Sequence, residues 1–403
     1  MKILVVNAGS SSLKYQLFDS TDFSVLAKGL CECIGISGGA IKHSLACGKS
    51  LTRSVDLPTH ATAMKLLCEI LVSDDYGCIA DMSEIGAIGH RFVHGGSYFS
   101  GSTLLTDEVL KITDKCGELA PLHTSAHMQG IAGCNEVMPG VPQVLVFDTA
   151  FHQTIPQKAY MYPIPYALYE EHQIRRYGFH GTSHLYVSEE MAKVLGGAQG
   201  TKIVTCHLGN GSSISAVKDG KSIDTSMGFT PLSGIEMGTR CGDIDPAIVA
   251  FIMQKKNISA DKITDYMNKN CGFLGISETS SDMREIFAEI QNGGPKAEQC
   301  QLAVDILGYQ IKKYIGSYSA AMGGVDAIVF TAGIGENTPK IRELACEGLE
   351  YLGVKFDKEA NDATFSSGGM QALTTADSKV KVYMIPTNEE LIIARDTYEI
   401  VKG

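Results

Sequence analysis

The sequence predicts an α/β protein with two similar lobes, and three observations support this fold class. The chain has 403 residues, which is long for one hydrophobic core and suits two domains. Short apolar runs typical of strands alternate with segments whose apolar residues have helical spacing. A pattern typical of a β-hairpin at residues 2–18 recurs at residues 202–217.

The two hairpin patterns share the chemistry of their turns. The first turn reads Asn7-Ala-Gly-Ser-Ser-Ser12 and the second reads His207-Leu-Gly-Asn-Gly-Ser-Ser213. Glycine allows successive backbone N–H groups to converge on an anion, and Ser12 and Lys14 could reach the same anion. An ordinary hairpin turn is the alternative for either copy alone. The duplication favours two lobes that each offer a phosphate-binding hairpin to a shared cleft.

The other elements follow in chain order. In the first half, we expect strands and turns over 20–57, a helix at 60–72, a strand at 85–93, helices at 106–116 and 125–137, and a strand at 143–147. In the second half, we expect helices at 183–195, 246–256, 260–268, 281–290 and 296–322, strands at 327–330 and 380–385, and a terminal helix at 389–401. The segment 155–176, rich in tyrosine and proline, predicts an irregular connection and a domain boundary.

Composition narrows the class of protein. The chain is 44% hydrophobic and 20% charged, as in soluble globular proteins. Twelve cysteines without a C-x-x-C pair, and no secretory signal pattern, predict reduced thiols in the cytoplasm. No apolar run approaches the ~18 residues that a membrane span needs. The net charge of −11 argues against general nucleic-acid binding, so we expect neither a membrane nor a nucleic acid as partner.

Two arginines are candidates for anion binding. Arg91 lies in Gly89-His-Arg-Phe-Val-His-Gly-Gly96, and Arg240 lies in Gly238-Thr-Arg-Cys-Gly-Asp-Ile-Asp-Pro246. A guanidinium matches phosphate oxygens bidentately and keeps its charge. A surface or ion-paired arginine is the commoner case, but the flanking glycines favour a ligand role here.

A histidine-containing motif precedes a predicted helix. In Gly178-Phe-His-Gly-Thr-Ser-His184, residues 181–183 could cap the helix and leave His180 at its mouth, where anions are favoured. His180 could then donate to a phosphoryl oxygen, whereas His184 could be a helix-surface residue. His123 and His127 have metal-pair spacing but lack a third ligand signal.

Other polar residues follow predicted strands. Asp148 ends a buried strand and is either a hydrogen-bonded turn carboxylate or a charged group in a cleft, and we favour the second. The glycines of 331–337 could let a nucleoside approach the backbone, although a plain strand–helix turn is equally consistent. The carboxylates of 387–390 suit a helix N-terminus whatever the function. Neither a Walker A loop nor a dinucleotide-binding glycine motif is present.

Taken together, these motifs resemble the acetate kinase family, from Asn7-Ala-Gly-Ser-Ser-Ser-Leu-Lys14 to Glu389-Glu390. Val146-Phe-Asp-Thr-Ala-Phe-His152 and Gly333-Ile-Gly-Glu-Asn337 lie between these ends. The resemblance implies the two-lobed actin-like ATPase fold, with a duplicated β-sheet core of ribonuclease H-like halves and an ATP cleft between the lobes. We therefore expect residues 1–150 with the helix 391–403 to form an N-terminal lobe, and 151–390 a C-terminal nucleotide-binding lobe.

The resemblance also implies an activity: reversible, ATP-dependent phosphorylation of acetate to acetyl phosphate by a homodimer, with ATP or ADP as co-substrate and Mg²⁺ (or Mn²⁺). By motif match, the catalytic residues would be Arg91, Asp148, His180 and Arg240, and the metal ligands Asn7 and Glu389. The nucleotide would contact Ser12, Lys14, His207, Leu208, Gly209, Asn210, Gly211, Asp282, Met283, Arg284, Gly333, Ile334, Gly335 and Asn337. The acetate pocket would comprise Arg91, Val93, Leu122, His123, Phe179 and Pro231.

The expected chemistry explains these residue types. Acetate is already ionised at neutral pH, so the transfer needs positioning and charge stabilisation, not a general base. Asp148 would then orient an arginine or metal-bound water. Two alternatives remain open at this point: a propionate or other short-chain acyl kinase of the same family, and a non-enzymatic ATP-gated protein like actin or a chaperone.

Overall fold

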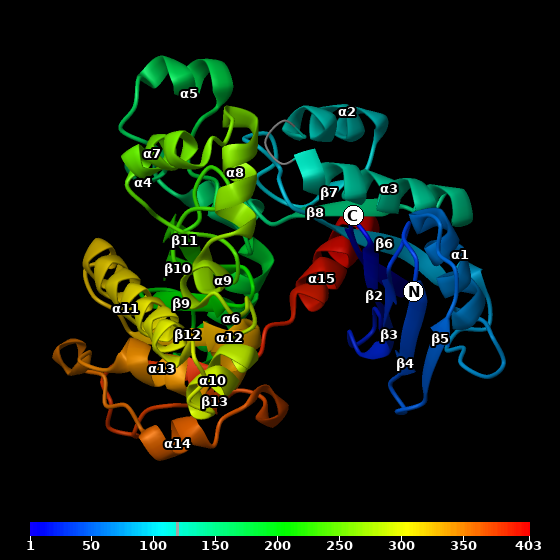
Figure 1. Ribbon diagram of the computed structural model, residues 1–403. Helices are drawn as coiled ribbons and strands as arrows, with labels where there is room; N and C mark the ends of the chain where they lie inside the picture. Colours follow the sequence, from blue (N-terminus) through cyan, green and yellow to red (C-terminus); the bar gives the residue numbers. More distant parts are fainter. Residues whose placement is uncertain (118–120) are drawn as a thin grey trace. The chain divides into compact units, whose positions relative to one another are not determined.

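The computed structural model describes residues 1–117 and 121–403, without the side chains of 121–123 (Figure 1). The described chain divides by packing into two compact units. Unit 1 comprises Met1–Ala150 and Asn388–Gly403, and unit 2 comprises Phe151–Thr387. Among the described residues, no helix is both long and apolar enough to span a membrane.

Unit 1 is built on one mixed sheet. In the described part of the chain its strand order is β5-β4-β3-β2-β1-β6-β8-β7. The strands are β1 (Lys2–Gly9), β2 (Ser12–Asp19), β3 (Val25–Glu32), β4 (Ala40–Leu45), β5 (Ser50–Ser54), β6 (Ile85–Phe92), β7 (Thr103–Leu104) and β8 (Gln143–Phe147). Strands β1 to β5 form an antiparallel meander, whereas β1, β6 and β8 run parallel.

Helices cover both faces of the central strands of unit 1. The helices are α1 (His60–Leu71), α2 (Asp107–Cys116), α3 (Pro121–Val137) and α15 (Glu389–Lys402). Side chains alternate along a strand, so Leu4 and Val6 of β1 pack in the core that α1 and α3 cover, while Ile3 and Val5 pack with α15 (Figure 1). Burial on both faces explains why β1 is a continuous apolar run.

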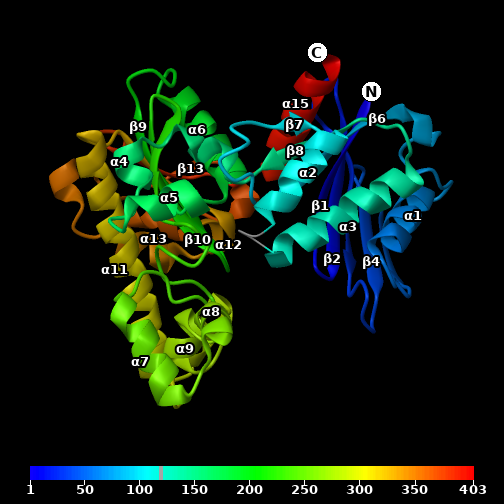
Figure 2. The ribbon, with the colours of Figure 1, turned by 90° about the horizontal axis from the view of Figure 1, so that it is seen from above.

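Unit 2 is built on a second mixed sheet, with strand order β11-β10-β9-β12-β14-β13 among the described residues. Its strands are β9 (Lys202–Leu208), β10 (Ser212–Lys218), β11 (Lys221–Thr225), β12 (Ala327–Thr331), β13 (Gln371–Ala372) and β14 (Lys381–Met384). Its helices are α4 (Gln157–Tyr160), α5 (Tyr166–His172), α6 (Gly181–Val194), α7 (Pro246–Lys256), α8 (Ala260–Lys269), α9 (Gly272–Ser277), α10 (Met283–Gln291), α11 (Ala297–Met322), α12 (Ala332–Asn337), α13 (Pro339–Cys346) and α14 (Lys358–Asp362). The long α11 packs on one face of the sheet and α6 on the other (Figure 2).

The two sheets repeat one topology. In unit 1 the hairpin β1–β2 lies beside the parallel strand β6, and in unit 2 the hairpin β9–β10 lies beside the parallel strand β12. A further parallel strand follows in each sheet, β8 in unit 1 and β14 in unit 2. The duplicated sheet core predicted from the repeated hairpins is therefore confirmed.

Some local expectations differ from the structure. The glycine-rich stretch 331–337 was expected as a turn, but residues 332–337 form the helix α12. Helix α9 was not predicted, because a six-residue segment with two glycines has too little periodicity to be recognised. Residues 388–390, expected in the second lobe, pack with unit 1, since Asn388 caps α15 through a hydrogen bond from the backbone N–H of Leu391 (3.2 Å).

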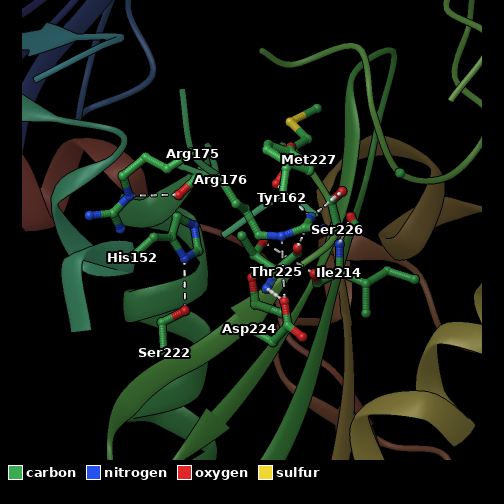
Figure 3. A network of polar contacts seen from close by, with 12 residues as sticks. His152, Tyr162, Arg175, Arg176, Ile214, Ser222, Asp224, Thr225, Ser226 and Met227 are labelled. Carbon is green, nitrogen blue, oxygen red and sulfur yellow. Dashed lines mark hydrogen bonds and ion pairs between the residues drawn. The ribbon is translucent and has the colours of Figure 1, made fainter. Parts of the chain in front are cut away.

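The segment 155–176, expected to be irregular, contains α4 and α5 and is held firmly to the sheet of unit 2 (Figure 3). The Nη1 atom of Arg176 donates to the backbone carbonyls of Thr225 (2.7 Å), Ser226 (3.1 Å) and Met227 (3.2 Å). The carboxylate of Asp224 lies 3.8 Å from Nε of the same guanidinium. One half-buried arginine thus ties this segment to the end of β11.

A fully buried arginine, Arg342 of α13, organises the polypeptide around α12. Its guanidinium is fully buried and donates to the carbonyls of Gly335 (2.9 Å), Glu336 (2.9 Å) and Thr364 (2.8 Å). It also donates to the side-chain and backbone oxygens of Asn361 (2.8 and 2.9 Å). Burial lowers the pKa of Arg342 to about 10, so the group stays charged at neutral pH and bonds five uncharged oxygens.

We predict that Arg342→Met destabilises the protein by about 4 kcal/mol, because several buried carbonyl oxygens lose their donor together. Urea unfolding of the full chain at neutral pH measures the change. Lys340→Ala, an exposed position on the same helix, serves as the control and is expected to change stability by less than ~0.5 kcal/mol. Equal unfolding midpoints for the two variants would contradict this role of Arg342.

Candidate functional site

The hairpin turn of unit 1 is compact and rich in polar groups. Gly9 and Ser12 face each other across the turn, and a Cβ on Gly9 would lie 2.8 Å from Oγ of Ser12, so a larger residue here would displace the Ser12 hydroxyl. Asn7 pairs with Lys14 in register, which places both beside the turn. Nε2 of His60, at the start of α1, donates to the Gly9 carbonyl (2.8 Å) and fixes the turn against that helix. Sequence reasoning missed His60, because its partner is distant in the chain.

The carboxyl ends of β6 and β8 bring Arg91 and Asp148 together. The guanidinium donates from Nε to Oδ1 (2.9 Å) and from Nη2 to Oδ2 (2.7 Å), a bidentate pair in which Asp148 is only 1% exposed. Glu389, in the first turn of α15, lies 3.9 Å from Nε of Arg91. Burial alone would lower the pKa of Arg91, but the Asp148 and Glu389 carboxylates outweigh it and raise that pKa. The arginine is therefore permanently charged and rigidly oriented.

Asn7 and Glu389, the predicted metal ligands, both belong to unit 1. No cluster of three or more His, Cys, Asp or Glu side chains suited to a metal is found in the described part of the chain. An amide and a carboxylate oxygen are hard donors, and Mg²⁺ binds few protein oxygens when substrate phosphates complete its shell. The donor set thus fits Mg²⁺ held together with a phosphate ligand.

In unit 2, His180 occupies the position immediately before α6. It has the left-handed backbone φ of 56°, and its Nδ1 lies 2.9 Å from Oγ of Ser213. Its ring stacks on that of His207, with centroids 4.1 Å apart. His180 therefore lies at the N-terminus of the helix as expected, held by two residues of the second hairpin.

Two details of this motif were predicted wrongly. Helix α6 begins at Gly181, so residues 181–183 are helical and do not form the cap. His184 is not a surface residue: it is fully buried, with Nδ1 2.7 Å from Oγ1 of Thr205 and Nε2 2.7 Å from Oγ of Ser213. The side chain faces the sheet because it follows His180 by one helical turn. The sequence did contain a signal for this burial: the predicted strands include Thr205 and Ser213, and polar residues are uncommon in a core.

Arg240 and His180 meet at the turn of the second hairpin. A Cβ on Gly211 would lie 3.4 Å from Nη1 of Arg240 and 3.5 Å from Nε2 of His180. The loop that carries Arg240 packs closely on this turn, since the Gly238 N–H donates to the Asn210 carbonyl (3.1 Å). Three predicted residues of unit 2, namely His180, Asn210 and Arg240, thus lie around a fourth, Gly211.

The environment of Arg240 differs from that of Arg91. Nη1 of Arg240 donates to the Pro231 carbonyl (3.2 Å) and contacts Sδ of Met237 (3.7 Å), and burial lowers the pKa of the guanidinium. The described residues place no carboxylate in ion-pair contact with it. This cation is therefore held by neutral groups.

A cavity of about 610 Å³ lies beside this turn. Its size suits a nucleoside. It is lined by Gly209, Asn210, Ser281, Asp282, Met283, Arg284, Gly333, Ile334, Asn337 and Thr338. Eight of these were predicted to contact the nucleotide; Ser281 and Thr338 were missed as chain neighbours of predicted residues.

Three other residues predicted to contact the nucleotide, namely His207, Leu208 and Gly335, do not line this cavity. Leu208 is fully buried in the core of unit 2, and His207 is 8% exposed with Nδ1 2.8 Å from Oγ of Ser183. The backbone carbonyl of Gly335 accepts a hydrogen bond from Nη1 of Arg342 (2.9 Å). His207 and Leu208 therefore fix the end of β9, and Gly335 fixes α12, while neighbouring residues of both elements line the cavity.

The residues predicted for the acetate pocket belong to both units. Val93 of unit 1 is 8% exposed and directly follows β6. Phe179 and Pro231 belong to unit 2, where the carbonyl of Phe179 accepts from Nε2 of His152 (2.9 Å). The side chains of Leu122 and His123 lie outside the described residues.

Comparison with known proteins gives one consistent result. The profile of the Acetokinase family matches residues 2–395. The acetate kinase of Thermoanaerobacterium thermosaccharolyticum is 57% identical over 405 residues, covering 100% of both chains. The acetate kinase of Methanosarcina thermophila is 55% identical over 403 residues, covering 100% of this chain and 97% of that protein.

Comparison with solved structures leads to the same family as the sequence comparisons. The acetate kinase of Porphyromonas gingivalis superposes with a TM-score of 0.93 at 45% identity, covering 99% of each chain. A propionate kinase from Francisella tularensis superposes with a TM-score of 0.90 at 41% identity, also covering 99% of each chain. The chain therefore belongs to the acetokinase family, a family of phosphotransferases with the actin-like ATPase fold.

Proposed function

We propose that this protein transfers the γ-phosphoryl group of ATP to acetate, reversibly and directly, giving acetyl phosphate and ADP. The observation that carries the proposal is the meeting of Arg240 and His180 at the Gly211 turn, beside a cavity of nucleoside size. A phosphoryl group that extends from a nucleotide in this cavity towards the turn would find a guanidinium and an imidazole. Relatives named acetate kinase at more than half identity support acetate as the acceptor.

Unit 1 supplies the second cationic group of the proposed reaction. Arg91 would neutralise the acetate carboxylate and the transferring phosphoryl oxygens, and Asp148 would hold the guanidinium in a single orientation. The carboxylate of acetate attacks phosphorus without losing a proton, so Asp148 need not act as a base. Val93, Leu122, His123, Phe179 and Pro231 would surround the methyl group.

Mg²⁺ (or Mn²⁺) would be held by Asn7 and Glu389 with the nucleotide phosphates, and it would neutralise charge on the leaving phosphates. Ser12, Lys14, Asn210 and Gly211 would supply further donors to the phosphate chain. All twelve cysteines are free thiols, which supports a reducing, cytoplasmic location.

A short-chain acyl kinase with propionate as acceptor is the second candidate. The Francisella tularensis propionate kinase, with a TM-score of 0.90, supports it. The two candidates share every catalytic group and differ only in the space around the acyl chain.

We also propose that the protein is a homodimer. Helix α7 has the apolar sequence PAIVAFIMQKK and not one of its residues is buried, with Ile248 42% and Phe251 59% exposed. An exposed helix of this composition is typical of an interface between subunits. A second copy of the chain would cover it.

Trapping of acetyl hydroxamate from acetate, ATP and hydroxylamine tests the proposed function. We expect product with wild type and a kcat lower by about a thousandfold or more in Arg91→Ala and Arg240→Ala, because each removes a cation from the transition state. Arg53→Ala, at an exposed position of β5, is the control and should keep full activity. A folded Arg240→Ala enzyme with near-wild-type kcat would remove that residue from the mechanism.

For Val93→Ala, we expect the ratio of kcat/KM for propionate to that for acetate to rise by about tenfold, since one added methylene is worth ~1–3 kcal/mol in an apolar pocket. Steady-state kinetics with the two acids measure the ratio. Val72→Ala, an exposed valine, should leave the ratio unchanged, and an unchanged ratio in Val93→Ala would place the pocket elsewhere.

Phe251→Glu is expected to convert the dimer to a monomer, because a carboxylate on α7 would have to be buried without a partner at the interface. Light scattering after size exclusion reads the mass directly. Tyr351→Glu, at a residue 73% exposed on another surface of unit 2, is the matched change and should remain dimeric. A monomeric wild type at micromolar concentration contradicts the proposed interface.

A further inference from the structure

The carboxyl group of Glu236 is buried in unit 2. The residue is 1% exposed, and neither Oε1 nor Oε2 has a hydrogen-bond partner among the described residues. The backbone of Glu236, in contrast, is held in place: its N–H donates to Oε1 of Gln310 on α11 (2.6 Å). An isolated carboxylate in such a place is very costly, so the group carries its proton in the folded protein. Consistently, burial raises the pKa of Glu236 to about 8.

This carboxyl lies in the loop that carries Arg240, here called the arginine loop and defined as residues 234–243. The loop is closed at its base, where the Gly234 N–H donates to Oδ1 of Asp243 (2.9 Å) and the Asp243 N–H donates to the Gly234 carbonyl (2.8 Å). Near its tip, the Met237 N–H donates to the Arg240 carbonyl (3.2 Å), and Sδ of Met237 touches Nη1 of Arg240. The residue next to Glu236 therefore touches the guanidinium itself.

The arginine loop is packed against α8, α9 and α11. The Phe273 and Leu274 N–H groups of α9 donate to the carbonyls of Met237 (2.9 Å) and Gly238 (3.0 Å). The Cys241 N–H donates to the Met267 carbonyl of α8 (3.3 Å). The loop can therefore move only if contacts with several helices break together.

Several other titratable groups lie in the arginine loop and on the helices packed against it. In the loop itself they are Arg240, Cys241 and Asp243, where burial raises the pKa of the Cys241 thiol to about 11. On α11, burial raises the pKa of Tyr314, whose hydroxyl donates to Asp243 (2.6 Å). Cys271 precedes α9, which contains no titratable side chain, and burial raises its pKa as well. The charged residues of α8 are exposed, namely Asp261, Lys262, Asp265 and Lys269.

We propose that Glu236 is a positioning residue: its uncharged carboxyl keeps the arginine loop packed, with Arg240 at the Gly211 turn, and loss of its proton releases the loop. This inference rests on the proposed function, in which Arg240 contacts the transferred phosphoryl group. An ionised Glu236 has to reach water, and because Met237 is its neighbour, that movement withdraws the contact that supports Arg240. Phosphoryl transfer would then decline in mildly alkaline solution while the rest of the chain stays folded.

The dependence of stability on pH has a definite sign. The unfolded chain releases the Glu236 proton near the ordinary carboxyl pKa, whereas the folded protein keeps it to about pH 8. Between these values the unfolded state binds fewer protons, so the contribution of Glu236 to stability falls as pH rises from about 5 to 8 and is constant above that. Glu236→Gln, which is isosteric and neutral, removes the fall.

The test compares kcat for acetate-dependent ADP release between pH 6 and 9.5 in wild type, Glu236→Gln and Asp396→Asn. We expect wild-type kcat to fall severalfold above about pH 8, and Glu236→Gln to hold its value through this range. Asp396 of α15 is the matched control, since burial raises the pKa of its carboxyl too, far from the arginine loop in sequence. Asp396→Asn should keep the alkaline decline.

Thermal unfolding of the same proteins gives a readout that needs no activity. We expect the Tm of Glu236→Gln to exceed that of wild type by a margin that grows from pH 5 to pH 8. Glu236→Met, apolar and of similar volume, should behave like Glu236→Gln and guards against a folding defect of the amide.

Each outcome decides between the two proposals. A wild type without acetate-dependent turnover at any pH would overturn the proposed function, while the Tm series would still report on the buried proton. Stabilisation of Glu236→Gln with an unchanged alkaline decline of kcat would overturn the positioning role. A Tm difference that does not vary with pH would show that the carboxyl is not held protonated and would overturn the inference as a whole.

Discussion

Burying a guanidinium is costly unless oxygen atoms meet its donors, and this constraint shapes the protein around several of its arginines. Arg176 and Arg342 satisfy it with backbone carbonyls and an amide, and each ties together segments that have no regular pairing. Arg91 satisfies it with the carboxylate of Asp148. In an acidic chain, these fixed partners decide which cations serve the architecture and which remain for a ligand.

Arg240 is the exception among these residues. It donates to a single oxygen of the described chain, at Pro231, and burial lowers its pKa where the carboxylates beside Arg91 raise the pKa of that residue. A cation with so few oxygen partners gains most from an anion that arrives with substrate. In the proposed reaction, Arg91 would therefore be the preorganised group, and Arg240 the one whose hydrogen bonds are completed by the transferred phosphoryl group.

The parts of the fold that could be predicted are those encoded by residues close together in the sequence. The duplicated hairpins were recognisable because the turn residues and the flanking apolar runs are contiguous, and the structure confirms a shared topology in both sheets. Asp148 was expected to orient an arginine or metal-bound water; the structure pairs it with Arg91, because the adjacent parallel strands β6 and β8 end at one edge. Membership of the acetokinase family then decides against the non-enzymatic alternative, since its members are kinases.

The residues that sequence could not place all depend on partners far away in the chain. His184 was expected at the surface, yet it bonds strand residues of the second hairpin. Arg342 was not singled out in the sequence, because its partners lie on α12 and around α14. Glu236 sits in a polar loop whose burial comes from α9 and α11, and nothing in its neighbours in sequence reveals that burial.

The return of the terminal helix to the first sheet orders events during biosynthesis. Helix α15 lies so close on β6 that a Cβ on Gly89 would be 2.4 Å from Oγ1 of Thr397 and 2.6 Å from Cγ2 of Ile393. The ribosome therefore makes the whole of unit 2 before it releases the segment that covers Ile3 and Val5. A nascent chain has to keep that apolar surface from aggregating throughout this interval, and Glu389, which belongs to the same segment, reaches its place beside Arg91 only after unit 2 has been made.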